Sequence, residues 1–361
     1  MNILPQQIKS LVNYGPRDYR LETLPLPEPK ARELLVKVGA CGICASDVHC
    51  WHGAPMYWGD GNPEKAWVKT PVVVGHEFYG TVVGYGEGAL EHFGVSPGDR
   101  VIAEQIIPCN QCRFCKDGKY WMCEKHDIYG FQTQDSDGGM TEYMLFKANS
   151  RVHKIPDTLT HEECALIEPF ACAVHAVNRA AIEFNDVVVL AGAGPLGTGM
   201  IQAIRLKNPK LFIVLDTIPE RLTLAKKLGA DLVFNPLEQD VDAEVRKLTD
   251  GYGCDIYIEA TGNPLAVNQG LQMIRRMGRY VEFSVFGKPA TVDWSIIGDR
   301  KELDVRGSHL GPHCYETVIS FFEKKWFTAE GIVTHSFPLA EWEQGFAMAS
   351  GRESIKVLLV P

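Results

Sequence analysis

The sequence predicts an α/β protein of two domains, one rich in β-strands and the other built on a doubly wound parallel sheet. Its 361 residues suffice for two domains of ~150 residues each. Residues 10–155 contain short apolar strands, such as 34–38 and 81–83, separated by glycine and proline. From residue 170 onward, apolar runs alternate with helical stretches, which is typical of strands joined by crossover helices.

Apolar runs mark the strands expected in the second domain. They begin at Val187, Leu211, Leu232, Asp255, Arg279 and Leu303. Near-continuous apolar strands separated by helices pack as a parallel sheet covered on both faces, and we assign this domain to 169–308. The remaining tail, 309–361, should hold one more helix near 316–325 and a final strand at 356–360. We expect the tail to join residues 1–168 in the first domain.

Composition and charge exclude several function classes. No apolar run approaches the ~20 residues that a membrane-spanning helix needs. The first seven residues lack the basic stretch and long apolar run of a secretory signal. A net charge of −9 argues against a nucleic-acid-binding surface. We therefore expect a cytoplasmic protein whose partners include neither membranes nor nucleic acids.

Four of the eleven cysteines lie in one loop. Cys109, Cys112, Cys115 and Cys123 follow the spacing C-x2-C-x2-C-x7-C. Four thiolates at this spacing can close a tetrahedron around Zn²⁺, which is typical of a structural site. An iron–sulfur cluster or four reduced surface thiols are the alternatives. We expect a structural zinc ion that stiffens the loop.

A second group of metal-binding side chains comes from three separate segments. The group combines a thiol, a hydroxyl, imidazoles and carboxylates. Its members are Cys44, Ser46, Asp47, His49, His76, Glu77 and Glu168. Each has an ordinary alternative role, since His-Glu pairs are commonly plain polar pairs and glutamates before proline commonly lie in turns. One thiolate, one imidazole and one carboxylate would nevertheless leave a zinc position open, as catalysis requires.

A glycine turn in the second domain predicts a dinucleotide site. The stretch 191–197 follows the strand 187–190 and precedes a helical pattern, which is the required context for this motif. The predicted contacts are Gly192, Gly194, Pro195, Leu196 and Gly197. The glycines allow a tight turn, and the helix N-terminus offers N–H donors to the pyrophosphate.

The strand after the glycine turn ends at Asp216, which predicts the choice of cofactor. A carboxylate there accepts hydrogen bonds from ribose hydroxyls and repels a 2′-phosphate, so we expect NAD. The alternative role for Asp216 is a strand-end cap. Arg221 follows five residues later, at a position where similar enzymes place a basic residue that flanks the adenine.

Taken together, these motifs resemble the zinc-dependent medium-chain dehydrogenase/reductase family over essentially the whole chain. The resemblance implies a GroES-like catalytic domain and a Rossmann NAD-binding domain. It also implies that Cys44 and His76 bind a catalytic zinc, with Glu168 where simple alcohol dehydrogenases have a third cysteine ligand. Glu77 would be the accompanying carboxylate, which binds zinc directly or exchanges with water. Two zinc ions and one NAD per chain are expected.

The resemblance also assigns roles in proton transfer. Zinc lowers the pKa of a hydroxyl group that it binds, so an alcohol can lose its proton and then a hydride. Ser46 would hydrogen-bond the substrate oxygen, with loop capping as its alternative role. His49 would relay the proton to solvent, unless it is an exposed loop residue. Asp47 would orient a zinc ligand.

Three features bear on the substrate. Glutamate in the zinc group is typical of the polyol branch, and sorbitol dehydrogenases carry an Arg-Tyr pair where this chain has Leu310-Gly311. The aromatic loop 51–71, with 100–105 and 281–287, resembles erythritol/threitol dehydrogenases. We expect oxidation of a secondary hydroxyl of a four-carbon polyol to the ketose with NADH formation. Sorbitol- or xylitol-type oxidation, L-threonine oxidation and a non-catalytic NAD-binding zinc protein are the alternatives.

Two further expectations concern the aromatic loop and assembly. The loop either covers the pocket, narrowed by Trp51, Tyr57 and Trp58, or forms a subunit contact. Members of the resembled family form homodimers or homotetramers, and 281–286 is a candidate edge strand between two cofactor domains.

Overall fold

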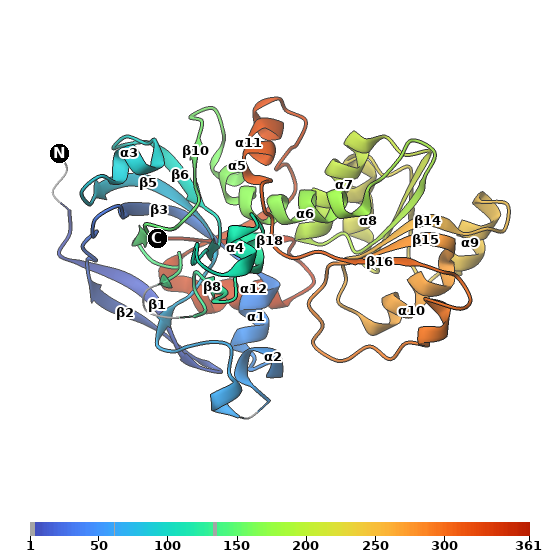
Figure 1. Cartoon of the computed structure of the whole chain (residues 1–361), viewed down its shortest axis with the longest axis horizontal. Helices are drawn as coiled ribbons and strands as arrows, with labels where there is room; N and C mark the ends of the chain where they lie inside the picture. Colours follow the sequence, from blue (N-terminus) through green and yellow to red (C-terminus); the bar gives the residue numbers. More distant parts are fainter. Residues whose placement is uncertain (1–3, 61, 133–135) are drawn as a thin grey trace. The chain divides into compact units, whose positions relative to one another are not determined.

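The computed structural model describes residues 4–60, 62–132 and 136–361. The chain forms two compact units, unit 1 with 1–168 and 315–361, and unit 2 with 169–314 (Figure 1). The expected tail begins at 309, whereas the structure changes units at Tyr315. Within the described ranges, none of the helices has the length and apolar character needed to cross a bilayer.

Unit 2 is organised around one parallel sheet of six strands. Their order is β13-β12-β11-β14-β15-β16, and every neighbouring pair is parallel. The strands are β11 (Val187–Ala191), β12 (Leu211–Leu215), β13 (Leu232–Phe234), β14 (Cys254–Glu259), β15 (Ile274–Glu282) and β16 (Asp304–Gly307). This is the doubly wound Rossmann order, in which the chain reverses direction of winding beside its first strand. The predicted fold class is confirmed.

Helices cover both faces of this sheet. They are α6 (Ile167–Ala180), α7 (Pro195–Lys207), α8 (Pro219–Lys227), α9 (Val241–Leu248) and α10 (Pro264–Met273), with the short 3-10 helix η4 (Trp294–Ile296). Figure 1 shows α7 and α10 on opposite sides of the strands. On the α10 side, Leu271 and Val267 pack with Tyr257 and Tyr280 of the sheet. Apolar residues on both faces explain why these strands are continuous apolar runs.

The edge strand of unit 2 differs from the expected one. Residues 281–282 belong to β15, which is paired with β14 on one side and β16 on the other. The edge position belongs to β16, where Val305 is 46% exposed. The prediction of an edge strand at 281–286 is therefore wrong, because a polar strand of four residues follows it in the sheet.

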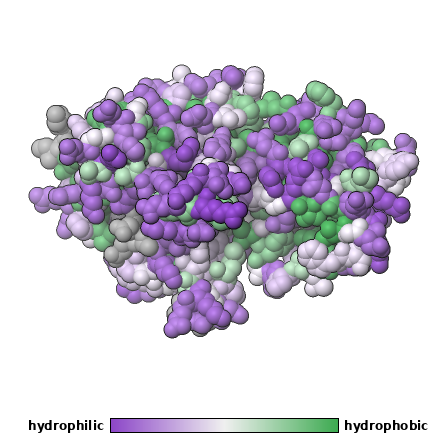
Figure 2. Space-filling model, in the orientation of Figure 1, coloured by the Kyte–Doolittle hydropathy of each residue, from purple (hydrophilic) through white to green (hydrophobic). Residues whose placement is uncertain are grey.

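Figure 2 shows that the face in view is mostly hydrophilic, with smaller hydrophobic areas.

Unit 1 is rich in β-strands. A three-stranded sheet, β2-β1-β4, lies beside a seven-stranded sheet of order β10-β6-β5-β3-β18-β17, in which β9 also pairs with β3. The strands are β1 (Gln7–Gly15), β2 (Asp18–Pro25), β3 (Leu34–Ile43), β4 (Val72–Val73), β5 (Glu77–Tyr85), β6 (Arg100–Ala103), β9 (Tyr143–Phe146), β10 (Val152–Ile155), β17 (Val333–Pro338) and β18 (Lys356–Val360). β7 (Ile106–Ile107) and β8 (Asp127–Ile128) form a separate two-stranded antiparallel sheet.

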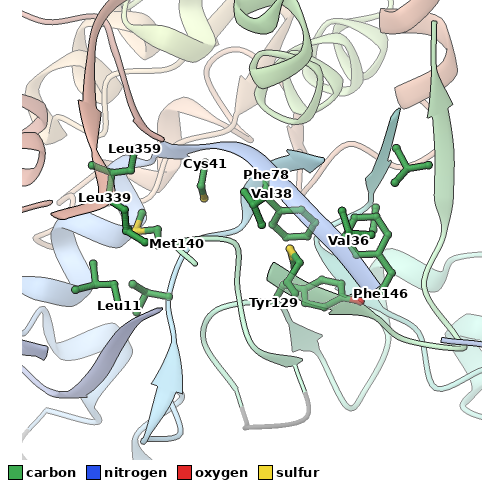
Figure 3. Packing of buried hydrophobic residues seen from close by; sticks show 14 of the residues in the cluster. Leu11, Val36, Val38, Cys41, Phe78, Tyr129, Met140, Phe146, Leu339 and Leu359 are labelled. Carbon is green, nitrogen blue, oxygen red and sulfur yellow. The ribbon is translucent and has the colours of Figure 1, made fainter. Parts of the chain in front are cut away.

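Short helices connect the strands of unit 1. They are α1 (Ala45–Trp51), α2 (Pro55–Trp58), α3 (Ala89–Phe93), α4 (Arg113–Lys116), α5 (His161–Ala165), α11 (Tyr315–Glu323) and α12 (Trp342–Ser350), with the 3-10 helices η1 (Pro63–Lys65), η2 (Tyr120–Met122) and η5 (Leu339–Glu341). The core between the sheets is a cluster of buried side chains that includes Val36, Phe78, Met140, Phe146 and Leu359 (Figure 3). The core therefore joins residues from both ends of the sequence.

The C-terminal strand returns to the first domain, as predicted. β18 pairs antiparallel with β3, and Val357 lies opposite Ile43. The prediction of only one tail helix is wrong, because α12 follows α11. Gly345 lies inside α12, and a glycine in mid-helix lowers helix propensity. A Cβ atom there would lie 2.9 Å from Leu359 Cδ2, so glycine permits the close packing of helix on strand.

Candidate zinc and cofactor sites

Cys44 lies where β3 ends and α1 begins. It is the N-cap residue of α1, with an extended backbone. Asp47, three residues into the segment, accepts a hydrogen bond from the Cys44 backbone N–H at 2.9 Å. This reciprocal capping arrangement fixes the turn, because one of the unpaired N–H groups at a helix start is satisfied. The thiol of Cys44 remains partly exposed and accessible to a metal ion.

His76 is placed by a glycine. Gly75 has φ +96°, and a Cβ atom there would lie 2.6 Å from Cys41 Sγ. The imidazole is buried, with Nδ1 3.4 Å from Asp47 Oδ1 and Nε2 3.5 Å from Ser46 Oγ. A carboxylate beside one ring nitrogen orients the other toward a metal. The expected role of Asp47 as an orienting carboxylate is consistent with this geometry.

Cys44, His76 and Glu77 converge on one point. One possible ligand atom from each lies within 4.8 Å of the others. The donor set is a thiolate sulfur, an imidazole nitrogen and a carboxylate oxygen, all of which bind Zn²⁺. His76 Nδ1 and Asp47 Oδ1 are buried with no closer hydrogen-bond partner than each other. The residues present therefore fit a zinc ion held through His76 Nε2.

Glu168 does not belong to this three-residue group. It lies in the first turn of α6 and is only 3% exposed. Its charge nevertheless acts on Lys356, a neighbour of the group. Direct ligation of zinc by Glu168 stays a prediction.

Lys356 is a buried neighbour of the metal group that the sequence motifs did not point to. Its side chain is 1% exposed, and Nζ lies 2.5 Å from Glu77 Oε2 and 3.3 Å from the Ile43 carbonyl oxygen. The sequence contains a signal for a paired lysine here. Lys356 is the first residue of an otherwise apolar strand, and lysines are almost never fully buried unless they are paired. Its partner could not be found from sequence, because it is Glu77, 279 residues earlier.

Charges dominate the electrostatics of this group. Burial alone would lower the pKa of Lys356, but Glu77, Cys44 and Glu168 together raise it above its ordinary value. Burial also opposes the charged form of His76, yet Asp47 and Cys44 hold the pKa of His76 well above its ordinary value. Without metal, the negative charges around His76 and Lys356 therefore favour their protonated, positively charged forms. A site that binds a cation should have this property.

Ser46 and His49 lie on α1 beside the metal group. Ser46 is the residue 3.5 Å from His76 Nε2. The pKa of His49 is lowered by burial, so the neutral imidazole is favoured. Both side chains lie on the same short helix, and their part in a proton relay stays a prediction.

The aromatic loop 51–71 places Tyr57 beside the candidate site, whereas Trp51 and Trp58 pack elsewhere. Tyr57 is buried, stacks on Phe131 at a centroid distance of 5.8 Å, and hydrogen-bonds Ser46. Trp51 instead packs on Tyr19 in the core at 4.9 Å. Trp58 Nε1 donates to the Cys50 carbonyl oxygen at 2.8 Å. Of the three aromatic residues expected to narrow a pocket, Tyr57 is the one whose hydroxyl interacts with Ser46 and with the charge of Cys44.

The four loop cysteines form a second, separate cluster. Possible ligand atoms of Cys109, Cys112, Cys115 and Cys123 all lie within 4.8 Å of one another. The Cys109 thiol accepts hydrogen bonds from the backbone N–H groups of Gln111 and Cys112 at 3.4 and 3.3 Å. These bonds lower the pKa of Cys109 to about 6, whereas burial raises that of Cys115 to about 12. Four convergent sulfurs fit a closed tetrahedral zinc site.

The glycine turn of unit 2 has the shape that a dinucleotide needs. Gly192 has φ +103°, and a Cβ atom there would lie 2.6 Å from the Ala260 carbonyl oxygen. Gly194 caps α7, and Pro195 occupies its first turn, followed by Leu196. A Cβ atom at Gly197 would lie 2.2 Å from the Gly192 carbonyl oxygen. Only glycine fits both positions, and the start of α7 keeps N–H donors for phosphate.

Asp216 and Arg221 flank this turn. Asp216 Oδ2 accepts a hydrogen bond from Ala193 N–H at 2.7 Å, and Oδ1 accepts one from Ile218 N–H at 2.9 Å. These bonds hold the carboxylate at the end of β12, beside the glycine turn. The Arg221 guanidinium lies above Gly194, where a Cβ atom would be 3.8 Å from Nη1. Both predicted side chains therefore lie where a dinucleotide would approach.

Comparison with known proteins identifies the family. A model of the alcohol dehydrogenase GroES-like domain matches residues 30–157, and a zinc-binding dehydrogenase model matches 195–324. The erythritol/L-threitol dehydrogenase of Mycolicibacterium smegmatis is 49% identical over 361 residues, covering 100% of this chain and 99% of that protein. The chain belongs to the zinc-binding dehydrogenases. The predicted medium-chain family and polyol branch are confirmed, and the protein is an oxidoreductase.

Further comparisons place this dehydrogenase among enzymes of related chemistry. The sorbitol dehydrogenase of Bacillus subtilis is 32% identical over 364 residues, covering 99% of this chain and 98% of that one. A zinc-binding dehydrogenase from Sinorhizobium meliloti bound to NADP has a TM-score of 0.88 at 26% identity, covering 99% of this chain and 100% of that one. A short chain alcohol dehydrogenase from Escherichia coli, complexed with NADH, has a TM-score of 0.86 at 28% identity with the same coverage.

Proposed function

We propose that this dehydrogenase oxidises a secondary hydroxyl group of a four-carbon polyol, such as erythritol or threitol, to the ketose and reduces NAD to NADH. The observation that carries the proposal is the convergence of Cys44, His76 and Glu77 within 4.8 Å, in a chain 49% identical to an erythritol/L-threitol dehydrogenase. Zinc at this group would supply Lewis acidity that lowers the pKa of the substrate hydroxyl. NAD would accept the hydride.

The chain's own residues would orient the substrate and move its proton. Ser46 Oγ lies 3.5 Å from His76 Nε2, the atom that would face the metal, and so can accept a hydrogen bond from a hydroxyl placed there. His49, whose pKa is lowered by burial, is a neutral acceptor that can pass the proton outward. Glu77 contributes negative charge beside the metal.

The features of unit 2 favour NAD and a small substrate. The Asp216 carboxylate would repel a 2′-phosphate, although Arg221 provides a nearby positive charge. A Cβ atom at Gly311 would lie 2.5 Å from the Ala171 carbonyl carbon, so the tyrosine of the sorbitol-type Arg-Tyr pair does not fit this backbone. This packing supports a substrate other than sorbitol. Two zinc ions per chain, one at each cysteine-containing group, complete the proposed cofactors.

A substrate panel tests the proposal. Purified zinc-loaded protein is mixed with NAD and erythritol, D- and L-threitol, xylitol, sorbitol, L-threonine or 2-butanol, and NADH absorbance is followed. We expect the highest kcat/KM with a four-carbon polyol, and loss of turnover after zinc is removed by a chelator. A preference for sorbitol or threonine would assign the enzyme to that substrate instead. Absence of turnover with every alcohol, at full zinc content, would support the non-catalytic alternative.

We also propose a cytoplasmic homodimer or homotetramer. The outer edge of β16 has no strand partner in the described part of the chain, and the nearby Trp294 is 76% exposed. Such an edge and an exposed aromatic side chain favour self-association. Light scattering of the purified protein measures the mass, and a monomeric mass would contradict this proposal.

A further inference from the structure

Two glutamates are neighbours at the carboxyl edge of the unit 2 sheet. Glu259 ends β14, Glu282 ends β15, and the two are paired in the parallel register. In the same row, Ala191 of β11 is paired with Glu259. Side chains alternate between the faces of a strand, so the glutamates share the face on which the rings of Tyr257 and Tyr280 stack two residues earlier. Two carboxylates therefore lie beside the residue that precedes the glycine turn.

The Glu259 carboxylate holds the turn that follows β14. Glu259 is fully buried, and its Oε1 accepts hydrogen bonds from the Thr261 N–H at 2.8 Å, from the Gly262 N–H at 3.2 Å and from the Thr261 hydroxyl. The Thr261 hydroxyl oxygen accepts one from the Asn263 N–H, at the start of α10, at 3.0 Å. All the groups that bond Oε1 are donors, which is the arrangement that an ionised carboxylate needs.

The turn held by this carboxylate packs directly on the glycine turn. The Ala260 N–H donates to the Ala191 carbonyl oxygen at 2.9 Å, and a Cβ atom at Gly192 would lie 2.6 Å from the Ala260 carbonyl oxygen. Gly262 has φ +68°, and a Cβ atom there would lie 2.9 Å from the Val285 carbonyl oxygen, in the segment after β15. Backbone contacts this close transmit a displacement of one turn to the other.

Glu282 is the carboxylate of the row that has an unpaired oxygen. Its Oε1 is buried without a hydrogen-bond partner among the described residues. Burial, followed by the charge of Glu259, raises the pKa of Glu282 to about 7, although a hydrogen bond from the Ser284 backbone N–H opposes this. The Tyr280 hydroxyl lies near both glutamates, which together with burial raise its pKa. β16 places Gly307, which has no side chain, opposite Glu282, and α10 covers this face with apolar side chains.

Loss of the Glu282 proton would place a second negative charge in this row. Like charges held close together in a partly buried site disfavour each other. The Glu259 carboxylate lowers this repulsion by moving away, which stretches its hydrogen bonds to the turn 260–262. The pyrophosphate of a dinucleotide at the glycine turn adds further negative charge to the same edge of the sheet. The protonated form of Glu282 is therefore the form that suits a bound dinucleotide.

We propose that Glu282 is a positioning residue for the cofactor: its proton lets Glu259 hold the turn 260–262 against the glycine turn, and loss of that proton weakens dinucleotide binding. The inference rests on the proposed function, because it assumes that NAD binds at the glycine turn. It adds a proton-dependent control of cofactor affinity, built into unit 2 and separate from the metal group.

Cofactor titrations at several pH values test the proposal. The Kd of NADH is measured by fluorescence and that of NAD by calorimetry, from about pH 6 to about pH 9, a range that spans the titration of Glu282. The proteins are the wild type, Glu282→Gln and the matched control Glu183→Gln, at an exposed position before β11. Glutamine keeps an N–H donor and cannot ionise, so Glu282→Gln represents the protonated form at every pH.

The expected results differ between the variants. The wild-type Kd should rise with pH by about 5- to 10-fold more than the Kd of Glu282→Gln, which is the low end of ordinary coupling between two sites. Glu183→Gln should follow the wild type. Calorimetry in two buffers of different ionisation enthalpy should also show that the wild type takes up part of a proton as NAD binds at about pH 8, because the protonated form binds more tightly. Glu282→Gln should show less uptake.

Hydrogen exchange supplies a readout that needs neither cofactor nor variant. After correction for the intrinsic exchange rate, protection of the Thr261 and Gly262 amides should fall in the wild type as pH rises through about 7. The same amides in Glu282→Gln should stay protected.

Two outcomes would overturn the proposal. One is the same pH dependence of Kd, with the same proton uptake, in the wild type and Glu282→Gln, as expected if Glu282 has only a structural role. The other is protection of the Thr261 and Gly262 amides that does not change with pH. A chain that binds neither NAD nor NADH at any pH would instead refute the proposed cofactor, and hydrogen exchange would still decide whether Glu282 controls the turn.

Discussion

At the scale of single residues, the candidate sites depend on a few pairs of atoms set by the backbone. Gly75 and Gly42 matter because they lack a Cβ atom, which brings His76 and Glu77 to the metal group. The resemblance to the dehydrogenase family implied the roles of Cys44, His76 and Glu77, since these residues lie in short segments that match the family pattern in order. Lys356 could not be predicted, because its role depends on a strand pairing between the two ends of the chain.

The proposed preference for NAD over NADP depends on one side chain, that of Asp216. We expect Asp216→Ala to lower the ratio of kcat/KM for NAD to that for NADP by roughly 10- to 100-fold, because hydrogen bonds to a charged group are worth about 1.5–3 kcal/mol and repulsion of the 2′-phosphate is lost. Steady-state kinetics with both cofactors measures the ratio. Asp216→Asn, which keeps one acceptor oxygen for the turn, separates the charge from the local structure. An unchanged ratio in both variants would show that another residue, such as Arg221, sets the preference.

At the scale of elements, the four-cysteine loop contains little regular structure. It holds only α4 and η2, of four and three residues, and such short helices are not stable alone. One side chain ties it to the rest of unit 1, since the Tyr120 hydroxyl donates to the buried Glu104 carboxylate at 2.7 Å. Bound metal would supply the remaining order.

Removal of one loop cysteine tests this view. We expect Cys112→Ser to lower bound zinc from two ions per chain to one and to lower the melting temperature by more than about 4 °C, since each 1 kcal/mol lost shifts a domain of this size by about 2–4 °C. Metal analysis and calorimetry measure both. Cys254→Ser, which removes a buried thiol from unit 2, is the control for metal content. Two zinc ions in Cys112→Ser would rule out the four-cysteine site.

At the scale of the whole molecule, fold class followed from the alternation of strands and helices, and the six-stranded order agrees with it. Three of the predicted strand starts differ from the structure, two of them by one residue and that of β15 by five, and the difference at β15 has a local reason. β15 begins at Ile274 rather than Arg279, because a register shift between Cys254 and Ile256 lets the chain enter the sheet early through a positive-φ residue, Met277. Irregularities of this kind leave no periodic pattern in the sequence.

Stability of the molecule should depend on pH through one pair of carboxylates. Glu282 of β15 lies opposite Glu259 of β14, and burial, followed by the Glu259 charge, raises the pKa of Glu282 to about 7 from its ordinary value of 4.5. Between these values the folded state keeps a proton that the unfolded state has released. The contribution to the free energy of unfolding is therefore complete below about pH 4.5 and is lost as pH rises through about 7.

The Glu282→Gln variant isolates this contribution. We expect its urea-unfolding free energy, relative to that of the wild type, to rise as pH increases from about 5 to about 8, because the amide cannot release a proton. Glu220→Gln, at an exposed position of α8, is the control and should follow the wild type. A wild-type pH dependence in Glu282→Gln would show that Glu282 carries no such proton.

The position of β18 between β3 and β17 has a consequence for synthesis of the protein. β18 follows every strand of unit 2 in the sequence, yet it is an inner strand of the unit 1 sheet, and it carries the lysine that pairs with Glu77. The Rossmann sheet of unit 2 has all of its strands before then, so it can form on the nascent chain. Unit 1 cannot complete its larger sheet until β18 has been synthesised, so a nascent chain that stops before Lys356 would have the cofactor-binding sheet but an incomplete sheet in unit 1.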